Sequence, residues 1–236
     1  MIIASNFKTN HTRASTEVFL KEVEAYMKVD GITDDVLVFP TATSLMQNES
    51  ILVGAQNAYP VANGSFTGEI GLDQLDEYGI RSILIGHSER RHILGEPQDL
   101  IAKKYDFFKA QGFTITYCIG EPLEVREQGH DAVIEYLSNQ MAGIDTDYDK
   151  LIVAYEPVWA IGTGVTATEA DIRTTHDTLK EKYGFASLLY GGSVKVENVA
   201  EILAIGSVDG VLIGTASWDY KQFCEILKKS KEVKGE

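Results

Sequence analysis

The chain has 236 residues, of which 44% are hydrophobic and 24% are charged, as in a globular protein with one large core. Its formal net charge of -14 argues against a nucleic-acid partner, because binding to the phosphate backbone requires a basic face. No apolar run reaches the roughly 18 residues of a membrane span, and residues 1–8 are too short an apolar start for a signal peptide. We therefore expect a cytoplasmic protein without a membrane partner.

The two cysteines, Cys118 and Cys224, lie far apart and lack the paired spacing of a zinc site. We expect neither a disulfide framework nor a bound metal. In so acidic a chain, an anionic substrate would require a local group of cationic side chains. Any lysine near a catalytic motif is therefore of special interest.

Eight short β-rich runs recur along the chain, and most of them are followed by an amphipathic helical pattern. In chain order the runs are Ile2–Ala4, Val36–Phe39, Ile51–Ala55, Ile83–Ile85, Phe113–Cys118, Leu151–Tyr155, Leu188–Tyr190 and Val211–Ile213. The helical patterns show in four groups of apolar residues: Phe19, Val23 and Met27; Ile101, Tyr105 and Phe108; Val199, Ile202 and Leu203; Phe223, Ile226 and Leu227.

The strands are continuous apolar runs, which indicates burial on both faces, as in a parallel sheet covered by helices. Eight such βα units can close into a barrel, although periodicity alone also permits a doubly wound sheet. No linker or low-complexity tract divides the chain, so we expect one domain over residues 1–236.

Polar and glycine residues gather directly after the strands, at their carboxyl ends. They are Asn6, Lys8, Gln56, Asn57, His87, Gly120, Glu121, Glu156, Gly191 to Ser193, and Gly214. In a barrel these positions form one rim, where the active sites of this fold are built. This clustering favours a single-domain (β/α)8 barrel of the α/β class with an active site at that rim.

The segment from Ala154 to Ala167 places a carboxylate, Glu156, at a strand end, followed by a rigid Pro-Val-Trp and two glycines. Pro157 restricts Glu156 to extended backbone, and the glycines can absorb the backbone change of a closing loop. This pattern indicates a general base under a lid. A lone glutamate in such a loop is more often an exposed side chain.

His87 and Glu89 immediately follow the fourth strand, at the start of a helical turn. The helix dipole there disfavours an imidazolium, and a neutral imidazole can donate a hydrogen bond to a carbonyl oxygen. The alternative is a capping histidine beside a surface Glu-Arg pair.

Asn6 and Lys8 are two positions apart, so on a strand both would face the barrel mouth, where Lys8 can neutralise an anion.

The ends of the last two strands carry Gly191, Gly192 and Ser193, then Gly214 and Thr215. Glycines let the backbone approach an oxyanion, and barrels commonly bind phosphate at these strand ends. Ser193 could also cap a helix. The alternative is a pair of tight turns.

Six segments together resemble the triosephosphate isomerase family in order and spacing over essentially the whole chain. They are Asn6 to Lys8, Ala55 to Asn57, Gly86 to Arg91, Cys118 to Glu121, the long segment around Glu156, and Tyr190 to Ser193. The resemblance implies interconversion of dihydroxyacetone phosphate and D-glyceraldehyde 3-phosphate through an enediolate, without metal or organic cofactor. The resemblance also implies the barrel architecture, pKa tuning and lid closure that are known features of this family.

The resemblance also implies a role for each site residue. Glu156 would be the base and His87 the electrophile, while Lys8 and Asn6 would stabilise the developing negative charge and bind substrate. Glu89 would pair with Lys8 or assist proton movement. The phosphate would be held by Gly162, Ser193, Gly214 and Thr215.

The same resemblance implies a lid and a homodimer. The lid would comprise Pro157, Val158, Trp159, Ala160, Ile161, Thr163 and Gly164 within a loop that runs to Ala167. The segment from Asn63 to Glu69 is similar to the family's dimer loop, with Thr67 as its tip contact on the partner.

Thr215 departs from the family pattern, in which a second glycine is common at this position. A β-branched residue would be strained at a positive φ, whereas in an ordinary region its N–H can still bind phosphate.

Two other functions compete with the isomerase. One is another phosphate-binding barrel enzyme, such as a sugar-phosphate epimerase, and the other is a non-catalytic phosphate-binding barrel.

Overall fold

The computed structural model describes residues 1–161 and 167–235. Each predicted strand run overlaps a strand of the structure. The strands are β1 (Ile2–Asn6), β2 (Asp35–Phe39), β3 (Leu52–Val53), β4 (Ser82–Ile85), β5 (Thr114–Ile119), β6 (Leu151–Tyr155), β7 (Leu188–Tyr190) and β8 (Gly210–Ile213). The third strand is shorter than its predicted run, and its missing end is a single bridge between Ala55 and Ile83.

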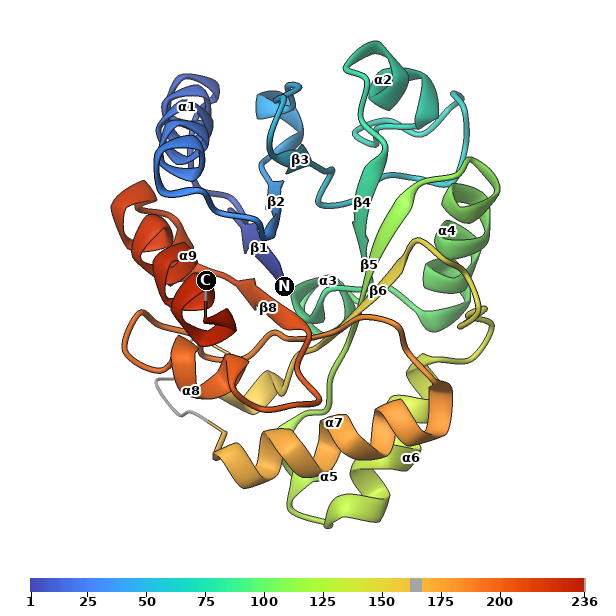
Figure 1. Cartoon of the computed structure of the whole chain (residues 1–236). Helices are drawn as coiled ribbons and strands as arrows, with labels where there is room; N and C mark the ends of the chain where they lie inside the picture. Colours follow the sequence, from blue (N-terminus) through green and yellow to red (C-terminus); the bar gives the residue numbers. More distant parts are fainter. Residues whose placement is uncertain (162–166, 236) are drawn as a thin grey trace.

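The eight strands form one parallel sheet in the order β3-β2-β1-β8-β7-β6-β5-β4. β1 pairs with both β2 and β8, and the Ala55–Ile83 bridge joins the two outer strands of this order. Figure 1 shows the strands at the centre of the molecule with helices around them. The structure is therefore the predicted (β/α)8 barrel, and the doubly wound alternative is excluded.

Most of the helices that follow the strands surround the barrel, whereas the short α3 lies near the centre of the view (Figure 1). They are α1 (Arg13–Asp30), α2 (Leu72–Glu77), α3 (Ser88–His92), α4 (Gln98–Ala110), α5 (Leu123–Arg126), α6 (His130–Gln140), α7 (Glu169–Tyr183), α8 (Val199–Leu203) and α9 (Tyr220–Lys234). Three 3-10 turns accompany them: η1 (Ala42–Ser44), η2 (Val158–Ala160) and η3 (Thr215–Ser217). The connection between β2 and β3 is short, and its helical part is the turn η1.

Helix α1 shows how the predicted periodicity becomes packing. Thr12 accepts the amide of Ser15, and the Ser15 side chain accepts the amide of Thr12, so the first turn is capped in both directions. Phe19 and Val23, one turn apart, are buried on the face toward the barrel. The helix ends at Gly31, whose φ of 62° is a left-handed conformation that glycine adopts without strain.

The core has two parts because each strand is covered on both sides. One cluster lies between the strands and the helices and includes the predicted apolar stripes of α1, α4, α8 and α9. The other cluster is formed by strand residues alone: Ala4, Leu37, Phe39, Leu84, Cys118, Ile152, Ala154, Leu189 and Leu212. The barrel is thus filled by side chains, and its open volume lies at the rim.

None of the helices in the described ranges combines the length and apolar character needed to cross a membrane.

The imidazole of His176, on α7, gives the fold a pH dependence. The residue is fully buried, its Nδ1 lies 3.2 Å from the carbonyl oxygen of Ser207, and burial lowers its pKa from 6.5 to about 4. The unfolded chain therefore takes up a proton below pH 6.5 that the folded chain rejects. The contribution of neutral His176 to the free energy of unfolding is fully present above pH 6.5 and is lost as the pH falls toward 4.

We expect the free energy of unfolding to fall by about 3 kcal/mol more in the wild type than in His176→Gln as the pH drops from about 6.5 to about 4. Urea unfolding at a series of pH values measures the difference between the two proteins. Other titrating groups are common to both proteins and cancel. Parallel pH profiles would contradict the assignment.

Candidate active site

A cavity of about 830 Å³ opens at the carboxyl ends of the strands. It brings together residues from five strand ends that the sequence separates widely. The predicted residues on its wall are Asn6, Lys8, His87, Glu156, Ile161, Ser193, Gly214 and Thr215. A carboxylate, an imidazole, an ammonium group and two glycine-rich loops therefore share one space.

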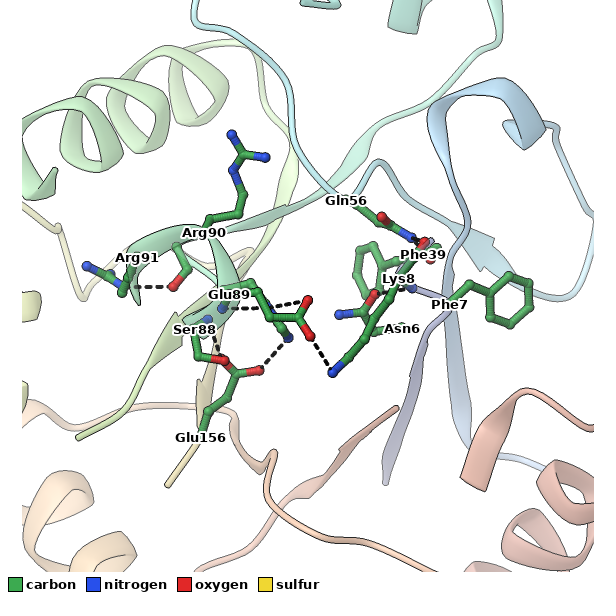
Figure 2. A network of polar contacts seen from close by, with 12 residues as sticks. Asn6, Phe7, Lys8, Phe39, Gln56, Ser88, Glu89, Arg90, Arg91 and Glu156 are labelled. Atoms are coloured by element: carbon green, nitrogen blue, oxygen red, sulfur yellow. Dashed lines mark hydrogen bonds and ion pairs between the residues drawn. The ribbon is translucent and has the colours of Figure 1, made fainter. Parts of the chain in front are cut away.

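The Glu156 carboxylate follows β6 and is only 2% exposed. Its Oε2 accepts the amide N–H of Ser88 at 2.9 Å, and its Oε1 lies 3.1 Å from His87 Nε2. Figure 2 shows Glu156 and Ser88 pointing toward each other, with the Glu89 carboxylate directed to Lys8 beside them. The carboxylate is therefore held by the start of α3.

Two opposing effects set the pKa of Glu156. Burial raises it, but the charge and hydrogen bond of His87, the Ser88 amide and the charge of Lys8 lower it, and these outweigh burial. The pKa of Glu156 thus lies below its usual range. The carboxylate is ionised, as a base must be.

His87 is the N-cap of α3, at the start of the predicted helical turn, and its Nδ1 accepts the amide N–H of Glu89 at 3.2 Å. An Nδ1 that accepts carries no proton, so the proton of the neutral ring lies on Nε2 and is donated to Glu156. Burial lowers the pKa of His87. The carboxylates of Glu156 and Glu89 raise this pKa by more than burial lowers it, so the net shift is upward. The predicted downward shift from the helix dipole is therefore wrong, because the charges of Glu156 and Glu89 determine the direction.

Lys8 does not lie on the strand, contrary to the prediction from strand alternation. β1 ends at Asn6, and Lys8 adopts a φ of 51° outside the strand. The Asn6 side chain accepts the Lys8 amide at 2.9 Å, which supports this left-handed turn. Lys8 reaches the cavity through that turn and not through strand alternation.

Lys8 Nζ lies 2.7 Å from Glu89 Oε1, so the ion pair expected from the resemblance is present. Glu89 lies on the wall of a second cavity of about 730 Å³, which shares Asn6, Lys8 and His87 with the first. An anion that enters the first cavity thus meets an ammonium group whose present partner is itself a carboxylate.

The two glycine-rich loops form another part of the cavity wall. Ser193 does not cap a helix as suggested, because α8 begins only at Val199. Asn198 accounts for the difference: its side chain accepts the Lys195 amide at 2.7 Å and donates to the Ser193 carbonyl at 3.0 Å, which makes a turn. Ser193 remains on the cavity wall.

Thr215 begins the 3-10 turn η3, where the Ser217 amide bonds the Gly214 carbonyl at 2.9 Å. Among non-glycine residues of the described ranges, only Lys8 and His11 have a positive φ. Thr215 is therefore unstrained. The amides of Thr215 and Ala216, at the N-terminal end of the turn, have no carbonyl partner within it.

The predicted lid is described only at its two ends. Pro157 precedes the turn η2, which contains Val158, Trp159 and Ala160, whereas Gly162, Thr163 and Gly164 lie outside the described residues. Trp159 Nε1 donates to Glu121 Oε1 at 2.9 Å, and the Val158 amide donates to the Glu121 carbonyl at 3.0 Å. Glu121, which the sequence placed at the rim without a role, thus anchors the start of this loop.

Two further residues at the site were not assigned a role from the sequence. Gln56 Nε2 donates to the carbonyls of Lys8, at 2.8 Å, and Phe39, at 2.9 Å. Trp218 Nε1 donates to the Asn6 carbonyl at 3.0 Å. Both fix the backbone of the β1 loop. Gln56 lies in one of the segments that resemble the family, which was the available signal, whereas Trp218 had none.

Within residues 1–161 and 167–235, no three histidine, cysteine, aspartate or glutamate side chains gather in a way that could hold a metal ion.

Comparison with known proteins gives the family. A sequence model described as triosephosphate isomerase matches residues 1–230. The chain belongs to the triosephosphate isomerase family. A relative of that name from Sulfurimonas denitrificans is 53% identical over 99% of this chain and 97% of its own. Relatives of the same name from a Nitratiruptor species and from Helicobacter pylori are 52% and 48% identical, over 99% and 96% of this chain and 100% and 97% of theirs.

The contacts of His87 predict its titration in this member of the family. In the free protein its pKa should lie above the ordinary 6.5. Glu156→Gln should lower this pKa, because it removes the negative charge that most stabilises the imidazolium while the ring stays buried. NMR titration of the imidazole measures both values, with the buried His176 as an internal control that should not move. The same pKa in both proteins would contradict the account.

Proposed function

We propose that the chain interconverts dihydroxyacetone phosphate and D-glyceraldehyde 3-phosphate through an enediolate, with Glu156 as the base. The observation that carries this proposal is the shared cavity, in which an ionised carboxylate and an imidazole face two glycine-rich loops. Membership of the triosephosphate isomerase family supports the same reaction.

Glu156 would remove a proton from the carbon beside the carbonyl and return it to the neighbouring carbon. The electron pair left by the proton forms the enediolate, so the carbonyl oxygen gains negative charge. The carboxylate now engages Ser88 and His87. Turning toward substrate would exchange these bonds for contact with the reacting carbon.

His87 would donate from Nε2 to the substrate oxygens and exchange protons with them. When Glu156 turns away, the largest charge that raises the pKa of His87 leaves with it. The Glu89 amide still occupies Nδ1, so the ring stays in the neutral form that donates through Nε2.

Lys8 and Asn6 would stabilise the charge that develops on those oxygens. An ammonium group so close to Glu89 can exchange one anion for another, so we propose that substrate competes with Glu89 for Lys8. Both Lys8 and Asn6 lie on the wall of the first cavity.

The phosphate would be held by Ser193, Gly214 and the Thr215 amide. The first amides of η3 need an acceptor, and an oxyanion supplies it. Gly162 is proposed as a further ligand on the strength of the resemblance. The lid, comprising Pro157 to Ile161, Thr163 and Gly164, would close over the substrate, exclude water and restrain the enediolate from eliminating phosphate.

We also propose a homodimer in which the segment from Asn63 to Glu69 enters the second cavity of the partner, with Thr67 at its tip. Two large apolar side chains beside that cavity are exposed, Ile93 by 76% and Leu94 by 66%. A partner loop would cover them. It would also cover the side of Lys8 and His87 that faces away from the substrate cavity.

Glu156→Asp should lower kcat by about a thousandfold, because the shorter carboxylate withdraws from the carbon while the phosphate site is unchanged. A coupled assay with glyceraldehyde 3-phosphate measures kcat, and inhibition by inorganic phosphate should stay near the wild-type value. Glu135→Asp, the same change at an exposed position of α6, should keep full activity. Absence of isomerisation by the pure wild type would overturn the function, and a near-normal Glu156→Asp would overturn the base.

Thr67→Glu should dissociate the dimer, because it places a charge at a contact that must be desolvated. Sedimentation velocity measures the oligomeric state, and kcat should fall together with dimer content. Thr174→Glu, at an exposed position of α7, is the matched control and should remain dimeric. A monomeric wild type, or a dimeric Thr67→Glu, would contradict the proposed interface.

A further inference from the structure

Gln140, the last residue of α6, makes two hydrogen bonds to the backbone of a single glycine. Its Oε1 accepts the amide of Gly120 at 2.7 Å, and its Nε2 donates to the Gly120 carbonyl at 3.0 Å. The residue is only 8% exposed. One planar amide thus binds both the N–H and the carbonyl of Gly120. The position and the orientation of the Gly120 backbone are therefore fixed together.

Gly120 follows β5 and packs directly on the backbone of Glu156. A Cβ atom added to Gly120 would lie 1.7 Å from the carbonyl oxygen of Glu156 and 2.7 Å from its carbonyl carbon. The Glu156 amide donates to the Ile119 carbonyl, one residue before Gly120, at 2.7 Å. The location of Gly120 therefore determines the location of the Glu156 backbone.

Gln140 is itself held from the barrel side. Tyr117, on β5, donates from its hydroxyl to the Gln140 carbonyl at 2.6 Å. Arg91 Nη2 donates to that hydroxyl at 3.1 Å and also reaches the Cys118 carbonyl at 3.1 Å. The amide thus extends from an anchored helix end and has little freedom to follow a displaced Gly120.

We propose that Gln140 is a positioning residue for the proton transfer, acting on Glu156 through Gly120. This inference rests on Glu156 being the base, as proposed above. A buried amide that merely satisfied two backbone groups would affect stability alone. This one acts on the residue in contact with the base, and a displacement of about 1 Å in a reacting group can lower a rate a hundredfold.

The effect should appear in kcat and not in substrate binding. The proposed phosphate ligands Ser193, Gly214 and Thr215 follow β7 and β8, whereas Gln140 acts on the end of β5. Phosphate affinity is therefore expected to be independent of Gln140, while the distance from carboxylate to carbon depends on it.

The main experiment is Gln140→Met, which keeps the side-chain length and removes both hydrogen bonds. We expect kcat to fall about ten- to hundredfold, while KM and inhibition by inorganic phosphate stay within about twofold of wild type. The matched control is Leu137→Val. Leu137 is fully buried on the last turn of α6, so this variant loosens the packing of the same helix end without removing a hydrogen bond of Gly120, Gln140, Tyr117 or Arg91, and its kcat should be retained.

Gln140→Glu adds a readout that a purely structural role would not change. As a carboxylate, the new side chain repels the Gly120 carbonyl, but once protonated it can donate to that carbonyl and accept the Gly120 amide, as glutamine does. Its kcat relative to Gln140→Met should therefore rise as the pH is lowered. The hydroxyls of Tyr136 and Tyr117 also bond Gln140, and like His87, His92 and Glu121 they are common to both variants and cancel in the ratio.

Equal losses of kcat in Gln140→Met and Leu137→Val would overturn the proposal, since the loss would then reflect a loosened helix. Unchanged kcat in Gln140→Met, or a pH-independent ratio of the two Gln140 variants, would also overturn it. Glu156→Asp, measured in parallel, separates this result from a failure of the base. If that variant loses activity and Gln140→Met does not, Glu156 remains the base and only the positioning role is refuted.

Discussion

Burial of the Glu156 carboxylate is the constraint on which the rim depends. A charged group that is only 2% exposed is tolerated only where hydrogen bonds and opposite charge replace its water. The Ser88 amide and the His87 ring supply the hydrogen bonds, and Lys8 supplies charge. These partners come from the ends of β1 and β4, so those loops must be held in register with β6.

The closed ring of parallel strands provides that register. Because every strand runs in the same direction, the loops that carry function emerge at one end, and the neighbours of β6 decide how much room Glu156 has. Both neighbouring strands are followed by glycine at this level. A Cβ on Gly120 would meet the Glu156 carbonyl, and one on Gly191 would lie 2.9 Å from Glu156 Cγ. The backbone of β6 can therefore sit deep in the rim with its carboxylate covered.

The eight strands, the barrel and the clustering of site residues followed from patterns that are local in the sequence. Apolar runs identify strands, and residues just after strands must share a rim. The active site could be identified only from the six family-like segments taken together, because Glu156 alone would be interpreted as an exposed side chain.

What the sequence could not provide depends on contacts between distant residues or on backbone conformation. The turn at Lys8 has a left-handed φ that no spacing argument gives. The side chain of Asn198 stabilises a turn that separates Ser193 from the start of α8. The upward shift in the pKa of His87 depends on Glu156, 69 positions further along the chain. The hydrogen bond of Trp218 to Asn6 spans 212 positions, and those of Gln140 to Gly120 span 20.

The two cavities at the rim share a wall formed by Asn6, Lys8 and His87. Each of these side chains therefore contacts two environments, the substrate cavity on one side and the second cavity on the other. A substitution that improved the fit on one side would have to be acceptable on the other, which narrows the evolutionary freedom of these positions. A small molecule that displaced the proposed partner loop from the second cavity would contact Lys8 and His87 from the side away from the substrate, and would inhibit the protein without resembling its substrate or competing with it for space.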